Sequence, residues 1–139
     1  MFLVQLVYTS KTSSDFGPED IENILEKARI NNRKNNVTGL LCFNNNFFLQ
    51  CLEGSRSAVN NTYHHILNDK RHSDIIMLNY SEIAEREFEQ WSMGYMPQTS
   101  LTDAINLKYS GTPNFDPYEM SGESTHKLML ALKHNIKIT

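Results

Sequence analysis

Apolar and polar residues alternate along some stretches of the chain and recur with helical spacing along others. Residues 2–10 carry apolar side chains at positions of both parities, which is typical of a strand buried on both faces. After a turn around Gly17, Pro18 suits the first turn of a helix. The apolar positions that follow have the i, i+3, i+4, i+7 spacing of an amphipathic helix: Ile21, Ile24, Leu25 and Ala28. We expect this helix to end near residues 31–33.

The middle of the chain predicts a hairpin, a second helix and two more strands. Residues 37–43 and 47–52 read as strands joined by three asparagines, which tolerate the positive φ of a hairpin turn. Ser55 can cap a helix whose apolar stripe is Val59, Tyr63, Ile66 and Leu67. Residues 75–80 predict a fourth strand, and residues 91–96 predict a fifth.

The resulting order, β-α-β-β-α-β-β, predicts an α+β fold, a ferredoxin-like sandwich with one added strand. Two helices then cover one face of the sheet. We divide the chain into residues 1–96 and a helical extension, residues 97–139, with helices over 101–109 and 123–136. The extension is too short to fold alone. We expect its two helices to pack on the bare face of the sheet or to mediate association.

Composition narrows the classes of function. The 139 residues suit one domain, and 40% hydrophobic with 21% charged residues is ordinary for a globular protein. A net charge of −3 without a basic stripe argues against nucleic-acid binding, and the apolar runs are too short to cross a membrane. Cys42 and Cys51 form no disulfide framework, which favours the cytoplasm. The histidines lack metal-ligand spacing, so we expect no metal site.

Polar residues occupy positions that the pattern assigns to the interior. Gln50 shares strand parity with Phe48, and Tyr8 lies on the same parity as apolar neighbours in the first strand. An inward amide costs about 1–3 kcal/mol unless its donor and acceptor are both satisfied. Simpler explanations stay open for each residue. Gln50 could face solvent, Tyr8 could be an ordinary core residue, and Asn31 and Asn32 could end the helix. Together, these residues suit a planar heterocycle between apolar walls.

The same residues lie in an ordered set of segments that resembles the BLUF family, blue-light sensors using flavin. The set runs from Leu3 to Met96, and the overall length of the chain with its two-helix tail resembles the short, stand-alone, PixD-like type. Its segments are Leu6-Val7-Tyr8-Thr9-Ser10, Ala28-Arg29-Ile30-Asn31-Asn32, Val37-Thr38-Gly39-Leu40-Leu41-Cys42, Phe48-Leu49-Gln50-Cys51-Leu52-Glu53-Gly54 and Phe88-Glu89-Gln90-Trp91-Ser92-Met93-Gly94.

The resemblance implies a noncovalently held flavin, FAD or possibly FMN, between the first two helices. The photoactive residues that it implies are Tyr8, Gln50, Trp91 and Met93. The cofactor-binding residues that it implies are Tyr8, Asn31, Asn32, Gln50, His65, Asp69, His72 and Met93. Two positions depart from the family pattern: Ala28 stands where relatives often have Ser, and His65 where they often have Arg. The first departure removes a possible hydrogen bond, the second weakens the expected grip on phosphate, and together they leave FAD and FMN open.

The resemblance further implies a blue-light photoreceptor rather than an enzyme. Light would rearrange the hydrogen bonds between Tyr8, Gln50 and the flavin. An inward–outward exchange of Met93 or Trp91 would then carry the change to the extension. The protein would act as a homo-oligomer. It would pass the signal to a separate partner, either a response-regulator-like protein or a transcription factor. The alternatives are a small flavin-dependent oxidoreductase and a cofactor-free ferredoxin-like binding module.

Overall fold

A computed structural model describes residues 2–44, 46–97 and 100–134, and it has the predicted order of elements. The elements are β1 (Leu3–Thr12), α1 (Pro18–Asn35), β2 (Thr38–Phe43), β3 (Phe47–Ser55), α2 (Arg56–Leu67), β4 (His72–Ile83), β5 (Gly94–Met96), α3 (Asp103–Ser110), the 3₁₀ helix η2 (Pro117–Glu119) and α4 (Gly122–Lys133). None of the helices in this described part is both long and apolar enough to cross a bilayer.

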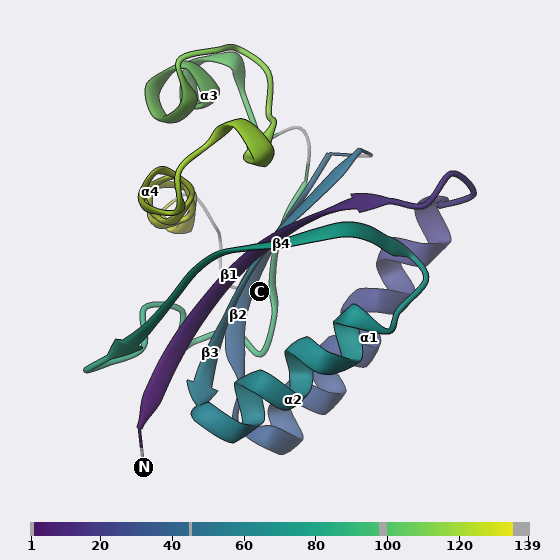
Figure 1. The fold of residues 1–139 in the computed structure, drawn as a ribbon, viewed down its shortest axis with the longest axis vertical. Coiled ribbons are helices and arrows are strands. Elements are labelled where there is room, and N and C mark those ends of the chain that lie inside the picture. The colour runs from purple at the N-terminus through teal and green to yellow at the C-terminus, as the bar shows by residue number, and fades with distance from the viewer. Residues whose placement is uncertain (1, 45, 98–99, 135–139) are drawn as a thin grey trace.

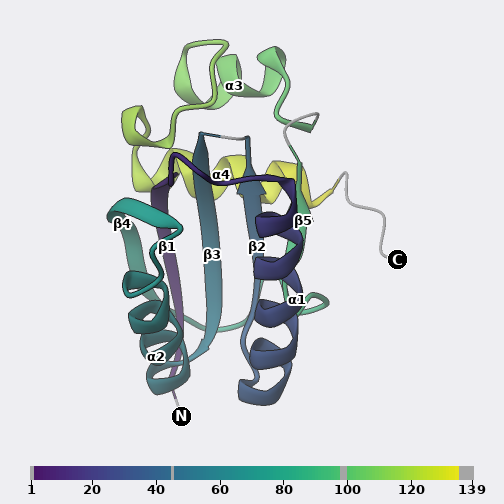
Figure 2. The ribbon, with the colours of Figure 1, turned by 90° about the vertical axis from the view of Figure 1, so that its right-hand side faces the viewer.

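The five strands form one sheet in the order β4-β1-β3-β2-β5. Neighbouring strands pair antiparallel except β5, which runs parallel to β2. Helices α1 and α2 cover one face, and α4 crosses the opposite face (Figures 1 and 2). The predicted ferredoxin-like α+β sandwich with an added strand is therefore confirmed.

The sheet separates two hydrophobic cores, and the central strands β1 and β3 supply side chains to both. Leu6 and Tyr8 face the core under α1 and α2, whereas Val7 between them faces the core under α4. This alternation explains why residues 2–10 carry apolar side chains at both parities.

Helix α4 seals the second core, as expected for the extension. Its apolar residues Leu128, Met129 and Leu132 are fully buried against the sheet. Helix α3 packs on α4 beyond the end of the strands (Figure 2). It begins at Asp103, two residues later than expected, because the hydroxyl of Thr102 caps the N–H of Ile105. The end of the predicted helix 123–136 lies outside the described residues.

Several predicted boundaries are wrong: the fourth strand, predicted over 75–80, covers His72–Ile83, and two further differences affect the site. Helix α1 continues to Asn35 and ends at Asn36, which takes the left-handed conformation, so Asn31 and Asn32 are helical residues rather than a helix stop. The predicted strand over 91–96 is a strand only from Gly94 onward. Residues 84–93, which we name the β4–β5 loop, are irregular because long-range hydrogen bonds from residues outside the loop hold them.

Gly122 shows how closely α4 approaches the sheet. A methyl group at this position would lie 2.3 Å from the carbonyl oxygen of Leu78 on β4. Alanine in a helix is ordinarily favoured over glycine by about 1 kcal/mol. Here the backbone of β4 cannot move without shifting the sheet against α4, so overpacking outweighs helix propensity.

We therefore expect Gly122→Ala to lower the free energy of unfolding by about 1–3 kcal/mol, measured by urea denaturation. The matched control is Glu123→Ala, because that side chain is 81% exposed and its loss should change stability by no more than about 0.5 kcal/mol. Equal or higher stability of the Gly122 variant would contradict this docking of α4.

Candidate functional site

The centre of the site is a pair of polar side chains on the two central strands. Tyr8 on β1 lies directly opposite Gln50 on β3, and both face the helices α1 and α2. Tyr8 is fully buried, Gln50 is 5% exposed, and the Tyr8 hydroxyl donates to Oε1 of Gln50. Burial, followed by the neighbouring Tyr63 and Asp69, raises the pKa of Tyr8 far above its usual value. The phenol therefore keeps its proton and acts as the donor.

The other end of the Gln50 amide meets sulfur rather than oxygen. Its Nε2 lies 3.4 Å from Sδ of Met93, a residue of the β4–β5 loop that is almost fully buried. A thioether is only a weak hydrogen-bond acceptor. Gln50 therefore makes one strong bond, to Tyr8, and holds its amide hydrogens beside a weak partner. Such an amide can donate to a stronger acceptor without breaking a strong bond.

A cavity of about 500 Å³ lies between α1 and α2, and Gln50 forms part of its wall. Six of the eight predicted cofactor-binding residues line it: Asn31, Asn32, Gln50, His65, Asp69 and His72. The other two, Tyr8 and Met93, contact Gln50 without lining the cavity. The remaining lining residues are Ile24, Lys27, Ala28, Asn35, Thr62, Ile66 and Arg71. The predicted residues thus converge on one place.

Helix α1 holds the loop that carries Met93. Asn32 is 2% exposed, and its Nδ2 donates to the carbonyl oxygen of Ser92 at 2.7 Å. One turn earlier, Nε of Arg29 donates to the carbonyl oxygen of Met93 at 3.1 Å. Asn32 therefore both lines the cavity and fixes the loop, whereas Asn31 is an exposed residue at the rim.

The charged groups gather around Asp69, after the end of α2. Arg71 donates to both carboxylate oxygens of Asp69, with the shortest bond at 2.7 Å. Partial burial would raise the pKa of Asp69, but these bonds outweigh burial and hold it below its usual value. Lys27 on α1 also lines the cavity, and His65 lies exposed at its edge. Lys27 and Arg71 give this part of the cavity a positive charge that the paired Asp69 offsets only in part.

His72 is a neutral residue in this structure. Burial lowers its pKa to about 4, despite the opposing effect of Asp69. Its Nδ1 lies 2.7 Å from the hydroxyl of Ser10, and its ring lies 4.4 Å from the ring of Phe48, measured between centroids. His72 therefore contributes a flat, uncharged wall rather than a cation.

Trp91 does not reach the cavity. Its half-buried ring packs with the second core, 6.2 Å from the ring centroid of Phe88 on the α4 side of the sheet. Of these two residues with an expected photoactive role, the structure brings Met93 to the Gln50 amide and leaves Trp91 on the opposite face. The photoactive role expected for Trp91 stays a prediction.

Sequence reasoning missed Lys27 and Arg71 as lining residues. Lys27 follows the same helical spacing as Ile24 and Asn31, so the face of α1 could have indicated it. Arg71 lies in a turn between α2 and β4, where no periodicity applies. Only its neighbours Asp69 and His72 pointed to that segment.

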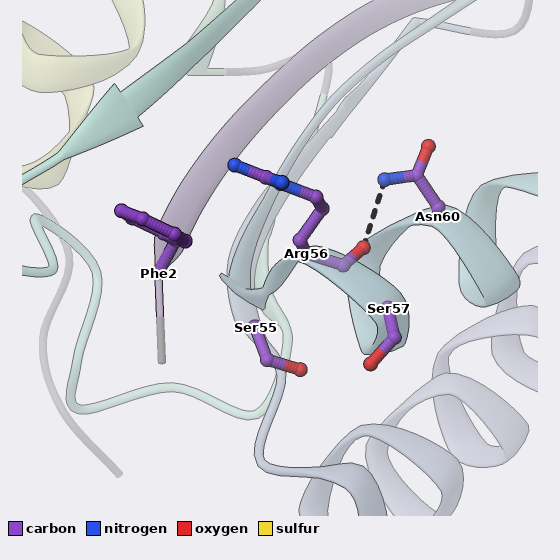
Figure 3. A pocket seen from close by; sticks show the side chains of 5 residues that line it. All are labelled: Phe2, Ser55, Arg56, Ser57 and Asn60. Carbon is purple, nitrogen blue, oxygen red and sulfur yellow. Dashed lines mark hydrogen bonds between the residues drawn. The ribbon is translucent and has the colours of Figure 1, made fainter.

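A second hollow at the start of α2 is a poor candidate for the site. Figure 3 shows its lining residues: Phe2, Ser55, Arg56, Ser57 and Asn60. None of these five is buried, and the Arg56 guanidinium is already paired with Glu82 at 3.0 Å and stacked 4.9 Å from the centroid of the Phe2 ring. A ligand there would find no buried polar group to recognise.

Comparison with known proteins agrees with this geometry. Residues 3–94 match the family model described as "BLUF: Sensors of blue-light using FAD". The chain is 32% identical over 104 residues to a photoactivated adenylate cyclase subunit beta of Euglena longa, covering 74% of this chain and 12% of the subunit. It is 34% identical over 91 residues to the blue light- and temperature-regulated antirepressor BluF of Escherichia coli (strain K12), covering 66% of this chain and 23% of BluF.

Solved structures extend the likeness to nearly the whole chain. The photo-activated state of BlsA superposes with a TM-score of 0.87 at 29% identity, covering 99% of this chain and 98% of BlsA. The dark state of BlrB, titled a BLUF protein, gives a TM-score of 0.77 at 29% identity over 94% and 97% of the two chains. The chain spans only 12% and 23% of the two curated relatives named above, whereas its match with BlsA and BlrB covers nearly all of both chains. On its sequence, fold and site, the chain belongs to the BLUF family of blue-light sensors that use flavin.

Proposed function

We propose that this chain holds a flavin in the cavity between α1 and α2 and responds to blue light through Tyr8 and Gln50. The observation that supports this most directly is the buried hydrogen bond from the Tyr8 hydroxyl to Gln50, whose amide is also part of the cavity wall. A buried phenol bonded to an amide that faces a ligand cavity can respond to a change in that ligand.

The lining residues fit the parts of a flavin. The amides of Asn31, Asn32 and Gln50 match the alternating donors and acceptors of a planar heterocycle, and Ile24 and Ile66 supply apolar walls. Lys27 and Arg71 can bind a phosphate group. The guanidinium of Arg71 can supply the phosphate-binding cation that relatives often have at the position of His65. We propose FAD as the natural cofactor, with FMN as the second candidate.

A flavin excited by blue light is a strong one-electron oxidant. Tyr8 is the suitable donor of an electron and a proton, because its hydroxyl is buried, protonated and already hydrogen-bonded. Gln50 carries a donor and an acceptor on one planar group, so its amide can present either atom to Tyr8. A change from one arrangement to the other would replace the weak contact with Met93 and alter the hydrogen bonds offered to the cavity.

We propose that the output is a signal to another protein rather than catalysis. The names of the relatives support a role in regulation: one is a cyclase subunit, of which this chain spans a small part, and one is an antirepressor. We keep a response-regulator-like protein or a transcription factor as the partner class, together with self-association. The buried free thiols of Cys42 and Cys51 are compatible with a reducing compartment, and we propose the cytoplasm.

Replacing the Tyr8 hydroxyl tests the proposed chemistry. We expect Tyr8→Phe to retain flavin yet lose the dark-reversible red shift of the absorption band after blue light, because the donor to Gln50 is gone. The matched control is Tyr63→Phe, whose ring lies 5.6 Å from that of Tyr8 in the same core. The control should cycle like the wild type. A normal red shift in Tyr8→Phe would remove Tyr8 from the mechanism.

Replacing Arg71 tests which end of the cavity binds phosphate. We expect Arg71→Gln to weaken FMN and FAD binding about tenfold, the worth of a charge-assisted hydrogen bond, and to leave riboflavin binding within about twofold. Fluorescence titration of the three flavins measures the difference. Lys70→Gln is the control, because Lys70 is an exposed neighbour that does not line the cavity. Equal weakening for all three flavins would mean that Arg71 shapes the cavity without binding phosphate.

A further inference from the structure

A buried carboxylate holds the β4–β5 loop from the face of the sheet opposite the cavity. Glu53 on β3 is fully buried, and its carboxylate accepts the backbone N–H groups of Glu87 and Phe88, each at 2.9 Å. Thr38 donates to the same carboxylate at 3.2 Å. Buried carboxylates are costly unless such donors satisfy them, so these bonds fix the first part of the loop firmly.

A single amide joins this carboxylate to a second one. Nε2 of Gln5 on β1, which is 1% exposed, donates to Glu53 Oε2 at 2.9 Å and to Glu87 Oε1 at 2.9 Å. An amide nitrogen has two hydrogens, and Gln5 thus uses one on each carboxylate. The loop residue Glu87 is therefore bound both through its backbone and through its side chain.

The cluster continues into α4. Nε2 of His126 lies 2.7 Å from Oε1 of Glu87, the same oxygen that accepts from Gln5. A carboxylate only accepts, so Nε2 of His126 carries the hydrogen in this bond. Both side chains are about three-quarters shielded from solvent. We name Gln5, Glu53, Glu87 and His126 the Glu87 cluster.

The other end of the same loop reaches Gln50, which forms part of the cavity wall. Only a few residues after Glu87, Met93 contacts Gln50, and Asn32 and Arg29 hold the backbone carbonyls of Ser92 and Met93. The loop is thus bound to the Tyr8–Gln50 side of the sheet at one end and to α4 at the other. With both ends bound, a displacement of Met93 would act on the bonds of Glu87, and a displacement of α4 would act on Met93.

We propose that Glu87 is a positioning residue that couples Met93 to α4 through its shared bonds with Gln5 and His126. The light-dependent part of this inference rests on the proposed function, whereas the coupling itself is present in the dark. The Glu87 cluster gives the response a specific route across the sheet, from the Gln50 amide through the β4–β5 loop to the helix that covers the opposite face.

The test uses the full-length, flavin-loaded protein with His126→Ala, which removes the donor on α4. In the dark, we expect hydrogen exchange at the backbone amides of Glu87 and Phe88, followed by NMR, to rise about threefold, the worth of a modest hydrogen bond. After blue light, the red shift should persist, while the exchange change that light produces in α4 should be lost. His126→Gln keeps a side-chain N–H donor and should restore both.

The matched control is Lys127→Ala, because Lys127 is the next residue of α4 and its only ion pair among the described residues is a 3.9 Å contact with Glu123. This control should behave like the wild type. Wild-type exchange at Glu87 and Phe88 and a wild-type α4 response in His126→Ala would overturn the coupling. A wild-type protein without any red shift would instead refute the proposed function, and the dark exchange would still decide whether Glu87 couples the loop to α4.

Discussion

The hydrogen bond between Tyr8 and Gln50 constrains much of the fold around it. Two polar side chains lie in the core between the sheet and α1 and α2, and each would cost about 1–3 kcal/mol without its partner. They meet only because β1 and β3 pair in one register, with Tyr8 directly opposite Gln50. A slip of one residue would turn Gln50 toward α4 and leave the phenol unpaired. The chemistry of the site therefore requires this register of the two central strands.

Features that follow from regular strand or helix periodicity could be predicted from the sequence, whereas features set by long-range bonds could not. Strand parity indicated that Tyr8 and Gln50 each share a face with apolar neighbours of their own strand, and the pairing of β1 with β3 brings the two faces together. Helical spacing predicted α1 and α2, and the ferredoxin-like order of elements predicted that both cover one face of the sheet. The irregular β4–β5 loop could not be predicted in this way, because bonds from distant residues such as Glu53 and Asn32 set its path. A pattern of apolar residues at 91–96 reads as a strand when those partners are unknown.

The same reasoning explains the outcome for Trp91 and Met93. Two residues apart on a regular strand would place both side chains on one face of the sheet. In the irregular loop that rule fails, and Trp91 packs with the α4-side core while Met93 reaches Gln50. The loop therefore has a large side chain on each face of the sheet. An exchange between Trp91 and Met93 would require the loop to turn over, and the bonds of Glu87 and Phe88 to Glu53 oppose that.

The extension after residue 97 cannot respond to light by simply leaving the sheet. Leu128, Met129 and Leu132 share one core with Leu40 and Cys51, so detachment would expose apolar surface that is worth roughly 1.5–3 kcal/mol per large side chain. A rearranged amide hydrogen bond supplies only about 0.5–1.5 kcal/mol. A signal of that size can shift a partly exposed polar contact such as the one between Glu87 and His126, but it cannot open the core. The division at residue 97 stays a prediction about function, and in the structure α4 and the sheet form the second core together.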